Sequence, residues 1–255
     1  MRPTSVAKSI RLGARWRRAA ASPAISTGPD WHKPRAVAVS GLTRISKDDT
    51  AMIDLYTGPT GNGQRAAIAL EESGLAYKTT KYNLQKGEHK NPDFLKINPL
   101  GAIPAIVDHD GAGGKKIVLT QSGAIVLYCA EKSGKLLPKD PERRAQAYRW
   151  FMHTSTDVGP ASGAIFATGS LPDKPASAVE LFQKRLINHL RESDRRLGEA
   201  EYLAGELSIA DIALYPIVAS RKALIEKAGG FTNLFKWFER MSARPGIQKG
   251  MQVSS

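Results

Sequence analysis

The chain has 255 residues, 42% of them apolar, which is enough for two domains with buried cores, and no stretch approaches the roughly 18–20 apolar residues of a membrane span. Its single cysteine, Cys129, excludes an intramolecular disulfide, a CxxC redox pair and a cysteine-based zinc site, and suits a reducing compartment. The net charge of +13 suggests a nucleic-acid partner, but ten of the Lys/Arg residues and only three acidic residues lie in residues 1–51, so we expect no nucleic-acid or membrane partner.

Residues 1–51 are rich in Arg, Ala, Ser and Pro and show no sustained hydrophobic period, which predicts a disordered extension. The first acidic residue is Asp30, and an Arg- and Ser-rich start with few acids is typical of a mitochondrial or plastid transit peptide. Two alternatives stay open: a plain disordered tail, or a true start at Met52, where the patterned region begins. We expect a cytoplasmic protein, or a mitochondrial one if the transit peptide is real.

Residues 52–134 alternate between strand and helix patterns, which predicts an α/β domain. The first three elements form a βαβ unit: a strand over Ile53–Thr57, a helix over Gln64–Ser73 that ends at Gly74, and a strand over Ala76–Leu84. A short helix, a hairpin and a last helix follow, at Asp93–Ile97, Ile103–Val107, Lys116–Leu119 and Ser122–Lys132. The stretch from Lys135 to Pro141 is predicted to be a linker.

Strand patterns disappear after this linker, and residues 141–246 are predicted to form an all-helical domain. Four segments carry a period of 3.6 residues: Arg143–Phe151, Val179–Leu197, Ile209–Ala219 and Leu234–Met241. The segment Leu207–Ile212 has the pattern of a capping box, with Ser208 as the cap and Asp211 reaching back to it. We therefore assign Asp211 a structural role.

The turn Pro59–Gly63 lies between the first strand and the first helix. A helix N-terminus presents unpaired N–H groups and about half a positive charge, so it favours anions, thiolates included. Thr60 and Asn62 add side-chain donors at this point. The alternative is an ordinary turn in which Asn62 caps the helix.

Two further features resemble parts of a binding site. The bond Ile103–Pro104 opens a predicted strand, and a cis form there would turn the backbone of Ile103 outward. The sequence Gln121-Ser122-Gly123 precedes a helix, where Ser122 either acts as an N-cap or helps the helix N-terminus to hold a carboxylate. A thiolate site, an outward-facing backbone and a carboxylate site together describe a receptor for glutathione.

This arrangement, joined to an all-helical domain, resembles the glutathione transferase family from about Met52 to Gly246. The resemblance is strongest to the nu class, relatives of the globular domain of the yeast nitrogen-catabolite regulator. It rests on the motifs Asp54-Leu55-Tyr56, Pro59-Thr60-Gly61-Asn62-Gly63, Phe94-Leu95-Lys96-Ile97-Asn98-Pro99, Ile103-Pro104-Ala105-Ile106-Val107-Asp108 and Gln121-Ser122-Gly123-Ala124-Ile125. It implies a thioredoxin-like N-terminal domain.

The resemblance also implies roles for individual residues. Thr60 and Asn62 would activate the glutathione thiol, in place of the Tyr, Ser or Cys of other classes. The backbone of Ile103, before Pro104, would pair with the cysteinyl part. Gln121 and Ser122 would hold the γ-glutamyl end, and His89 would approach the glycyl carboxylate unless it is a solvated loop residue.

Some positions depart from the family pattern or receive another interpretation. Ala102 stands where relatives tend to carry Lys or Arg. Lys184 and Arg185 are uncertain choices for a basic residue that a partner subunit supplies in some relatives. We predict packing roles for Tyr56 and Cys129, and a surface or packing role for His153, which could otherwise face the pocket for the second substrate.

The resemblance implies that the chain uses glutathione as co-substrate, without a metal, to reduce disulfides or to conjugate small electrophiles. Because no cysteine is available at the site, both reacting thiols would come from bound glutathione. The family also implies a homodimer. The alternative function is a non-enzymatic, glutathione-binding regulatory module on the same fold.

Overall fold

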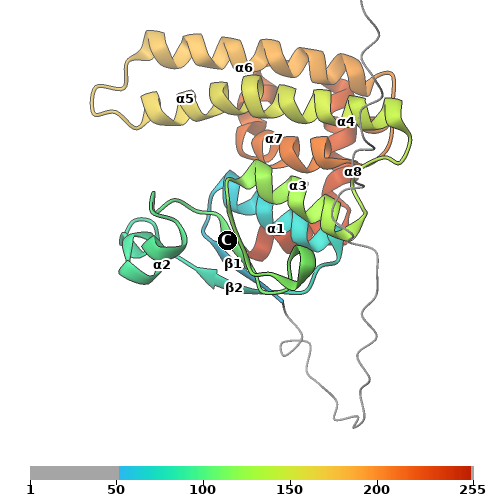
Figure 1. Cartoon of the computed structure of the whole chain (residues 1–255). Coiled ribbons are helices and arrows are strands. Elements are labelled where there is room, and N and C mark those ends of the chain that lie inside the picture. The colour runs from blue at the N-terminus through green and yellow to red at the C-terminus, as the bar shows by residue number, and fades with distance from the viewer. Residues whose placement is uncertain (1–51, 254–255) are drawn as a thin grey trace, which may run out of the picture.

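The computed structural model describes residues 52–253, so the predicted extension over residues 1–51 lies outside the described part. An α/β domain comes first and a helical domain follows (Figure 1). The first domain contains β1 (Ile53–Thr57), α1 (Gly61–Ser73), β2 (Tyr77–Lys81), α2 (Pro92–Ile97), β3 (Ala105–Asp108), β4 (Ile117–Thr120) and α3 (Ser122–Ser133), with short 3-10 turns η1 (Glu88–Lys90) and η2 (Ala112–Gly114).

The four strands form one mixed sheet in the order β2-β1-β3-β4. β1 pairs in parallel with β2, as a βαβ unit requires, and antiparallel with β3, which pairs antiparallel with β4. This is the thioredoxin-like arrangement that the resemblance implied. β1 has the predicted bounds, whereas two strands are shorter than predicted: β2 ends at Lys81 and β3 begins only at Ala105.

The side chains of β1 alternate between the two faces of the sheet. Ile53, Leu55 and Thr57 are buried in the core, and Tyr56 points to the opposite face. There the Tyr56 ring packs against Tyr82 and against Phe94 of α2. The packing role predicted for Tyr56 agrees with these contacts.

The helical domain contains α4 (Pro141–His153), a π-helical turn η3 (Thr154–Val158), α5 (Gly159–Gly169), α6 (Ala176–Leu197), α7 (Ile209–Ala228) and α8 (Thr232–Ser242). α5 was not predicted, because its residues are mostly small or apolar and show no one-sided pattern. Figure 1 shows α5 and α6 side by side, with α7 between this pair and the first domain. No helix of the described part is long and apolar enough to cross a membrane.

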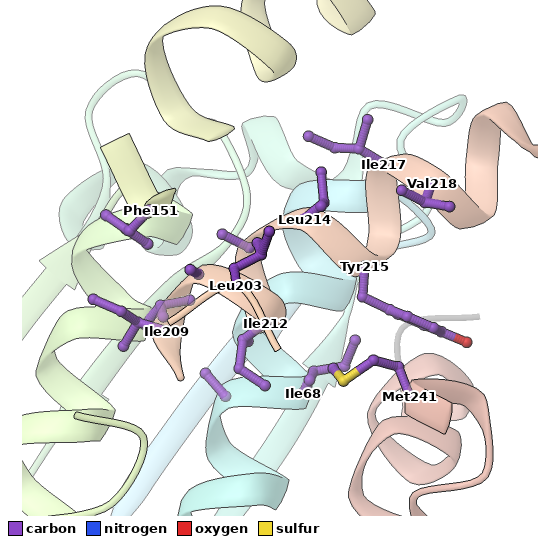
Figure 2. Close-up of a cluster of buried hydrophobic side chains, with 14 of the residues drawn as sticks. Ile68, Phe151, Leu203, Ile209, Ile212, Leu214, Tyr215, Ile217, Val218 and Met241 are labelled. Atoms are coloured by element: carbon purple, nitrogen blue, oxygen red, sulfur yellow. The ribbon is translucent and has the colours of Figure 1, made fainter. Parts of the chain in front are cut away.

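α7 is the central helix of the core, since its first ten residues are all buried. Its apolar side chains meet Ile68 of α1 and Met241 of α8 in one continuous cluster (Figure 2). The predicted capping box at its start is present: Ser208 accepts from the Ala210 N–H, and Asp211 accepts from the Ser208 N–H at 3.0 Å. The core therefore fixes α1, which carries the predicted thiolate site, against the helical domain.

The last helix, α9 (Pro245–Val253), continues beyond residue 246 and returns to the first domain. It packs against α1 closely enough that a Cβ on Gly250 would meet the backbone of Ile68 at 2.6 Å. Arg244 also donates two hydrogen bonds to Glu72 of α1, whose side chain is only 6% exposed. These contacts hold the C-terminal end of α1 while its N-terminal end faces the candidate site.

Candidate functional site

The N-terminus of α1 lies directly after the turn that follows β1. Thr60 is the N-cap, and its hydroxyl oxygen accepts from the Gly63 N–H at 3.0 Å. The alternative in which Asn62 caps this helix is therefore wrong. Gly63 permits the tight turn, because a Cβ there would lie 2.4 Å from the Gly58 carbonyl oxygen. Asn62 is left exposed in the first turn of the helix.

The orientation of the Asn62 amide is determined by its neighbours. Its Oδ1 accepts from an Arg65 guanidinium nitrogen at 2.8 Å and from the Ser122 hydroxyl at 3.3 Å. Arginine has donors only, so the atom that faces it must be the amide oxygen and not the nitrogen. The NH₂ group of Asn62 therefore points away from Arg65 and is available to an acceptor at the start of α1.

Arg65 joins α1, α3 and α7 at this site through hydrogen bonds. Besides Asn62, it donates to the Ser122 hydroxyl at 2.8 Å and to the Ala213 carbonyl of α7 at 3.1 Å. Burial lowers the pKa of Arg65 to about 10, so the guanidinium is still charged at neutral pH. No local pattern indicates this role for Arg65, because a single arginine in a helix is normally a solvated residue.

The start of α3 differs from the prediction in one respect. Its N-cap is Gln121, without a side-chain capping bond, and Ser122 is the first helical residue, so the alternative in which Ser122 is the N-cap is wrong. The hydroxyl of Ser122 instead contacts Arg65 and Asn62. The N-termini of α1 and α3 are thereby joined by side-chain hydrogen bonds.

Gln121 has an unusual backbone conformation, with φ 71° and ψ 113°. Such a conformation costs a non-glycine residue about 1–3 kcal/mol and is concentrated at ligand-binding positions. The bond Ile103–Pro104 is cis, as the sequence suggested, and Ile103 lies just outside the ladder of β3. Gln121 is the residue that begins α3, and Ile103 lies two residues before Ala105, which pairs with Tyr56 near the end of β1.

His89 lies in η1, ahead of α2, and its Nδ1 is buried without a hydrogen-bond partner among the described residues. A buried imidazole nitrogen without a partner is costly, so it marks a position where a polar ligand group would be stabilised. Among the described residues His89 makes no hydrogen bond to α1 or α3, and its predicted role in binding a carboxylate stays a prediction.

The remaining predicted residues lie elsewhere. Cys129 is fully buried in α3, and burial raises the pKa of its thiol to about 12, which agrees with a packing role. Lys184 is exposed on α6 and pairs with Glu180, and Arg185 beside it is exposed too. His153 faces His189 of α6. Ala102 is exposed before the cis bond and offers no charge.

Comparison with known proteins agrees with this geometry. Residues 51–131 match the N-terminal domain and residues 163–252 the C-terminal domain of glutathione S-transferases. The chain is 37% identical over 203 residues to the disulfide-bond oxidoreductase YfcG of Escherichia coli, which covers 78% of this chain and 94% of that protein. The chain belongs to the glutathione S-transferase family.

Solved structures give the same result. A glutathione transferase from Pseudomonas putida, with one glutathione disulfide bound per subunit, superimposes with a TM-score of 0.73 at 33% identity, covering 80% of this chain and 93% of that one. Ure2p in complex with glutathione superimposes with a TM-score of 0.71 at 26% identity, covering 78% and 92%. The predicted similarity to the nu-class group is thereby confirmed.

Proposed function

We propose that this chain is a glutathione-dependent enzyme that reduces small disulfides and also conjugates glutathione to small electrophiles. The observation that carries the proposal is the Asn62 amide, which Arg65 holds with its NH₂ group directed outward at the N-terminus of α1. A donor that is fixed before the substrate arrives stabilises a thiolate without the cost of reorganisation.

The energy that this site must supply is modest. A free cysteine thiol has a pKa of about 8.5, so only a few per cent is thiolate at neutral pH. Lowering that pKa by about two units requires about 2.7 kcal/mol, since each unit corresponds to 1.36 kcal/mol. A charge-assisted hydrogen bond from the Asn62 amide, a second from the Thr60 hydroxyl and the dipole of α1 together reach this magnitude.

The reaction follows from the position of the anion. The glutathione thiolate attacks one sulfur of the substrate disulfide, forming a mixed disulfide and releasing the other half as a thiolate that takes up a proton. A second glutathione thiolate attacks the mixed disulfide, which releases the remaining thiol and forms glutathione disulfide. Two thiols are oxidised and one disulfide is reduced, and Cys129 takes no part because it is buried.

The relatives support this choice of reaction. YfcG is named a disulfide-bond oxidoreductase, and the Pseudomonas putida protein holds glutathione disulfide, the product that the second step would form. The N-termini of α1 and α3 would take the sulfur and the γ-glutamyl carboxylate respectively, Ile103 would pair with the cysteinyl backbone, and His89 would face the glycyl end. Gln121 would add a polar side chain at the γ-glutamyl end.

We further propose a homodimer. The family resemblance implies this dimer, and the helical domain exposes three large apolar side chains that an interface could cover, Met152, Phe166 and Leu181. The resemblance also implies that a partner subunit supplies a basic side chain to the site. Lys184 and Arg185 of α6 are exposed and would be the residues to test.

The test of the proposed function is glutathione-dependent reduction of 2-hydroxyethyl disulfide by the full chain, followed beside conjugation of glutathione to a chlorodinitrobenzene. We expect saturable disulfide reduction that exceeds conjugation in kcat/KM by at least about tenfold, because a disulfide needs only a thiolate whereas an aryl chloride also needs its own pocket. Glutathione binding without turnover of either substrate would contradict the proposal and leave a binding module.

A further inference from the structure

A second polar cluster lies in the helical domain and takes no part in the proposed reaction. It consists of His153 at the end of α4, Asp157 in η3 and His189 on α6. One nitrogen or oxygen atom of each residue lies within 4.8 Å of the corresponding atoms of the other two. The sequence places His153 and Asp157 four residues apart, but only the packing of α6 against η3 brings His189 to them.

Both ring nitrogens of His153 face oxygen atoms. Its Nδ1 lies 3.2 Å from an Asp157 carboxylate oxygen, and its Nε2 lies 3.3 Å from the His189 backbone carbonyl. A neutral imidazole carries one N–H and can donate to only one of these oxygen atoms. With the N–H on Nε2, the Nδ1 lone pair faces the Asp157 carboxylate, an arrangement that a cation between the two atoms would stabilise.

The backbone at this point is also unusual. Residues Thr154–Val158 form a π-helical turn between α4 and α5, and the Gly159 N–H bonds to the Thr154 carbonyl. Single π-helical turns occur frequently at functional sites, because the extra residue redirects side chains on one face of the helix. Asp157 lies within this turn, so the turn determines its position relative to His153.

We propose that His153, Asp157 and His189 bind a divalent transition-metal ion, with Zn²⁺ the best match to two imidazoles and one carboxylate. Zinc binds such ligands at about 2.0–2.2 Å, so neighbouring ligand atoms lie about 3–4 Å apart. His153 and Asp157 already have this separation, and the His189 ring packs against His153 with a ligand atom within 4.8 Å of both.

The contact from Nε2 of His153 to the His189 carbonyl would hold the His153 ring in place while Nδ1 binds the metal ion. Histidine ligands usually donate their second ring N–H to a carbonyl or carboxylate, which fixes the ring and the tautomer. The site would keep one open coordination position for water and would join α4 and η3 to α6. Its effect would therefore be to stabilise the helical domain.

The chain contains a matched comparison for this site. His109 lies 2.7 Å from the Asp54 carboxylate, an ordinary histidine–carboxylate ion pair, and neither residue belongs to the three-residue cluster that the described part contains. If proximity of one histidine to one carboxylate were enough, both pairs would bind zinc. If three convergent ligands are required, only the His153 cluster would.

The experiment is a calorimetric titration of the untagged full chain, freed of metal, with zinc chloride. We expect one zinc ion per chain, and binding at least about tenfold weaker in each of the variants Asp157→Asn and His189→Ala, since each variant removes one of the three ligands. The variant His109→Ala should bind zinc as the wild type does. Saturating zinc should raise the midpoint of thermal unfolding of the wild type by at least about 2–4 °C.

Asp157 and His189 are both partly exposed, and glutathione binding by each variant reports on the fold independently. Absence of zinc binding to the wild type would overturn the proposal and identify His153–Asp157 as an ion pair only. Zinc binding that survives both Asp157→Asn and His189→Ala would overturn it as well. Neither outcome bears on the proposed disulfide chemistry, which needs no metal.

Discussion

Replacing Asn62 with Asp should lower kcat/KM for glutathione-dependent disulfide reduction at least about tenfold, or by 1.4 kcal/mol or more in transition-state stabilisation. Asp has the shape of Asn, so the oxygen that contacts Arg65 is retained. The outward NH₂ donor, however, becomes a negatively charged oxygen. A carboxylate at this position repels the thiolate that the amide would stabilise.

The Asn62→Asp substitution should lower mainly kcat at neutral pH. The KM for glutathione should change less, because Gln121 and the Ile103–Pro104 backbone are unaffected. Steady-state kinetics at several glutathione concentrations would measure this separation. The matched control is Asn188→Asp, the same change at an exposed position of α6, which should leave turnover unchanged. Wild-type turnover in the Asn62→Asp enzyme would show that the amide does not act on the thiol.

Arg65→Met tests the same arrangement from the other side. Methionine keeps the length of the stem and removes the cation that holds the Asn62 oxygen and the Ser122 hydroxyl. We expect kcat to fall, as it does in Asn62→Asp, because the Asn62 amide is then able to rotate and present its oxygen to the thiolate. Arg65→Met also loses the bond to the Ala213 carbonyl of α7, so its stability must be measured beside its kinetics.

Replacing Asp211 with Asn should lower the free energy of unfolding by about 3–5 kcal/mol, more than most single substitutions do. The Asp211 carboxylate is completely buried and accepts four hydrogen bonds, from the Leu203 N–H, the Ser208 N–H and hydroxyl, and the Trp237 Nε1–H. An amide replaces one acceptor by a donor, which then opposes two N–H or O–H groups in the core. Each buried donor left without an acceptor costs about 1–3 kcal/mol.

Burial raises the pKa of Asp211 to about 6 despite these four donors, so the group is ionised in the measurement we suggest, urea unfolding at pH 7.5. Ser208→Ala removes the bond that caps α7 and one of the four donors to Asp211, and should cost about 1–2 kcal/mol. The matched control Asp173→Asn lies on an exposed loop and should change stability by no more than about 0.5 kcal/mol. An Asp211→Asn protein as stable as the control would show that the capping box contributes little to this fold.

Much of this fold follows from local sequence patterns. The βαβ unit, the hairpin, the capping box at Ser208 and the cis bond at Pro104 each depend on a few adjacent residues, and the structure confirms them. Two helices, α5 and α9, are missed. α5 has few polar residues to mark a face, so no period distinguishes it from a loop of small residues, and α9 begins at Pro245-Gly246, a pair typical of a turn. Sequence patterns therefore give elements with a clear contrast between buried and exposed faces.

The site shows where such patterns stop being informative. Thr60, Asn62 and Ser122 were predicted from their places at helix starts, but Ser122 does not cap its helix, because Arg65 and Asn62 engage its hydroxyl. Arg65 is three residues from Asn62 and 57 from Ser122, and nothing local indicates that one guanidinium joins them. Such contacts depend on how α1, α3 and α7 pack, as does the meeting of His189 with His153.

The most direct test of thiolate stabilisation is a pH titration of glutathione bound to the full chain, followed by the ultraviolet absorbance of the thiolate. Free glutathione titrates as an ordinary thiol, with a pKa of about 8.5. We predict that the pKa of the bound thiol is lower by about two units in the wild type and returns most of the way in Asn62→Asp. Bound glutathione that titrates like free glutathione would contradict the account, whatever turnover the enzyme shows.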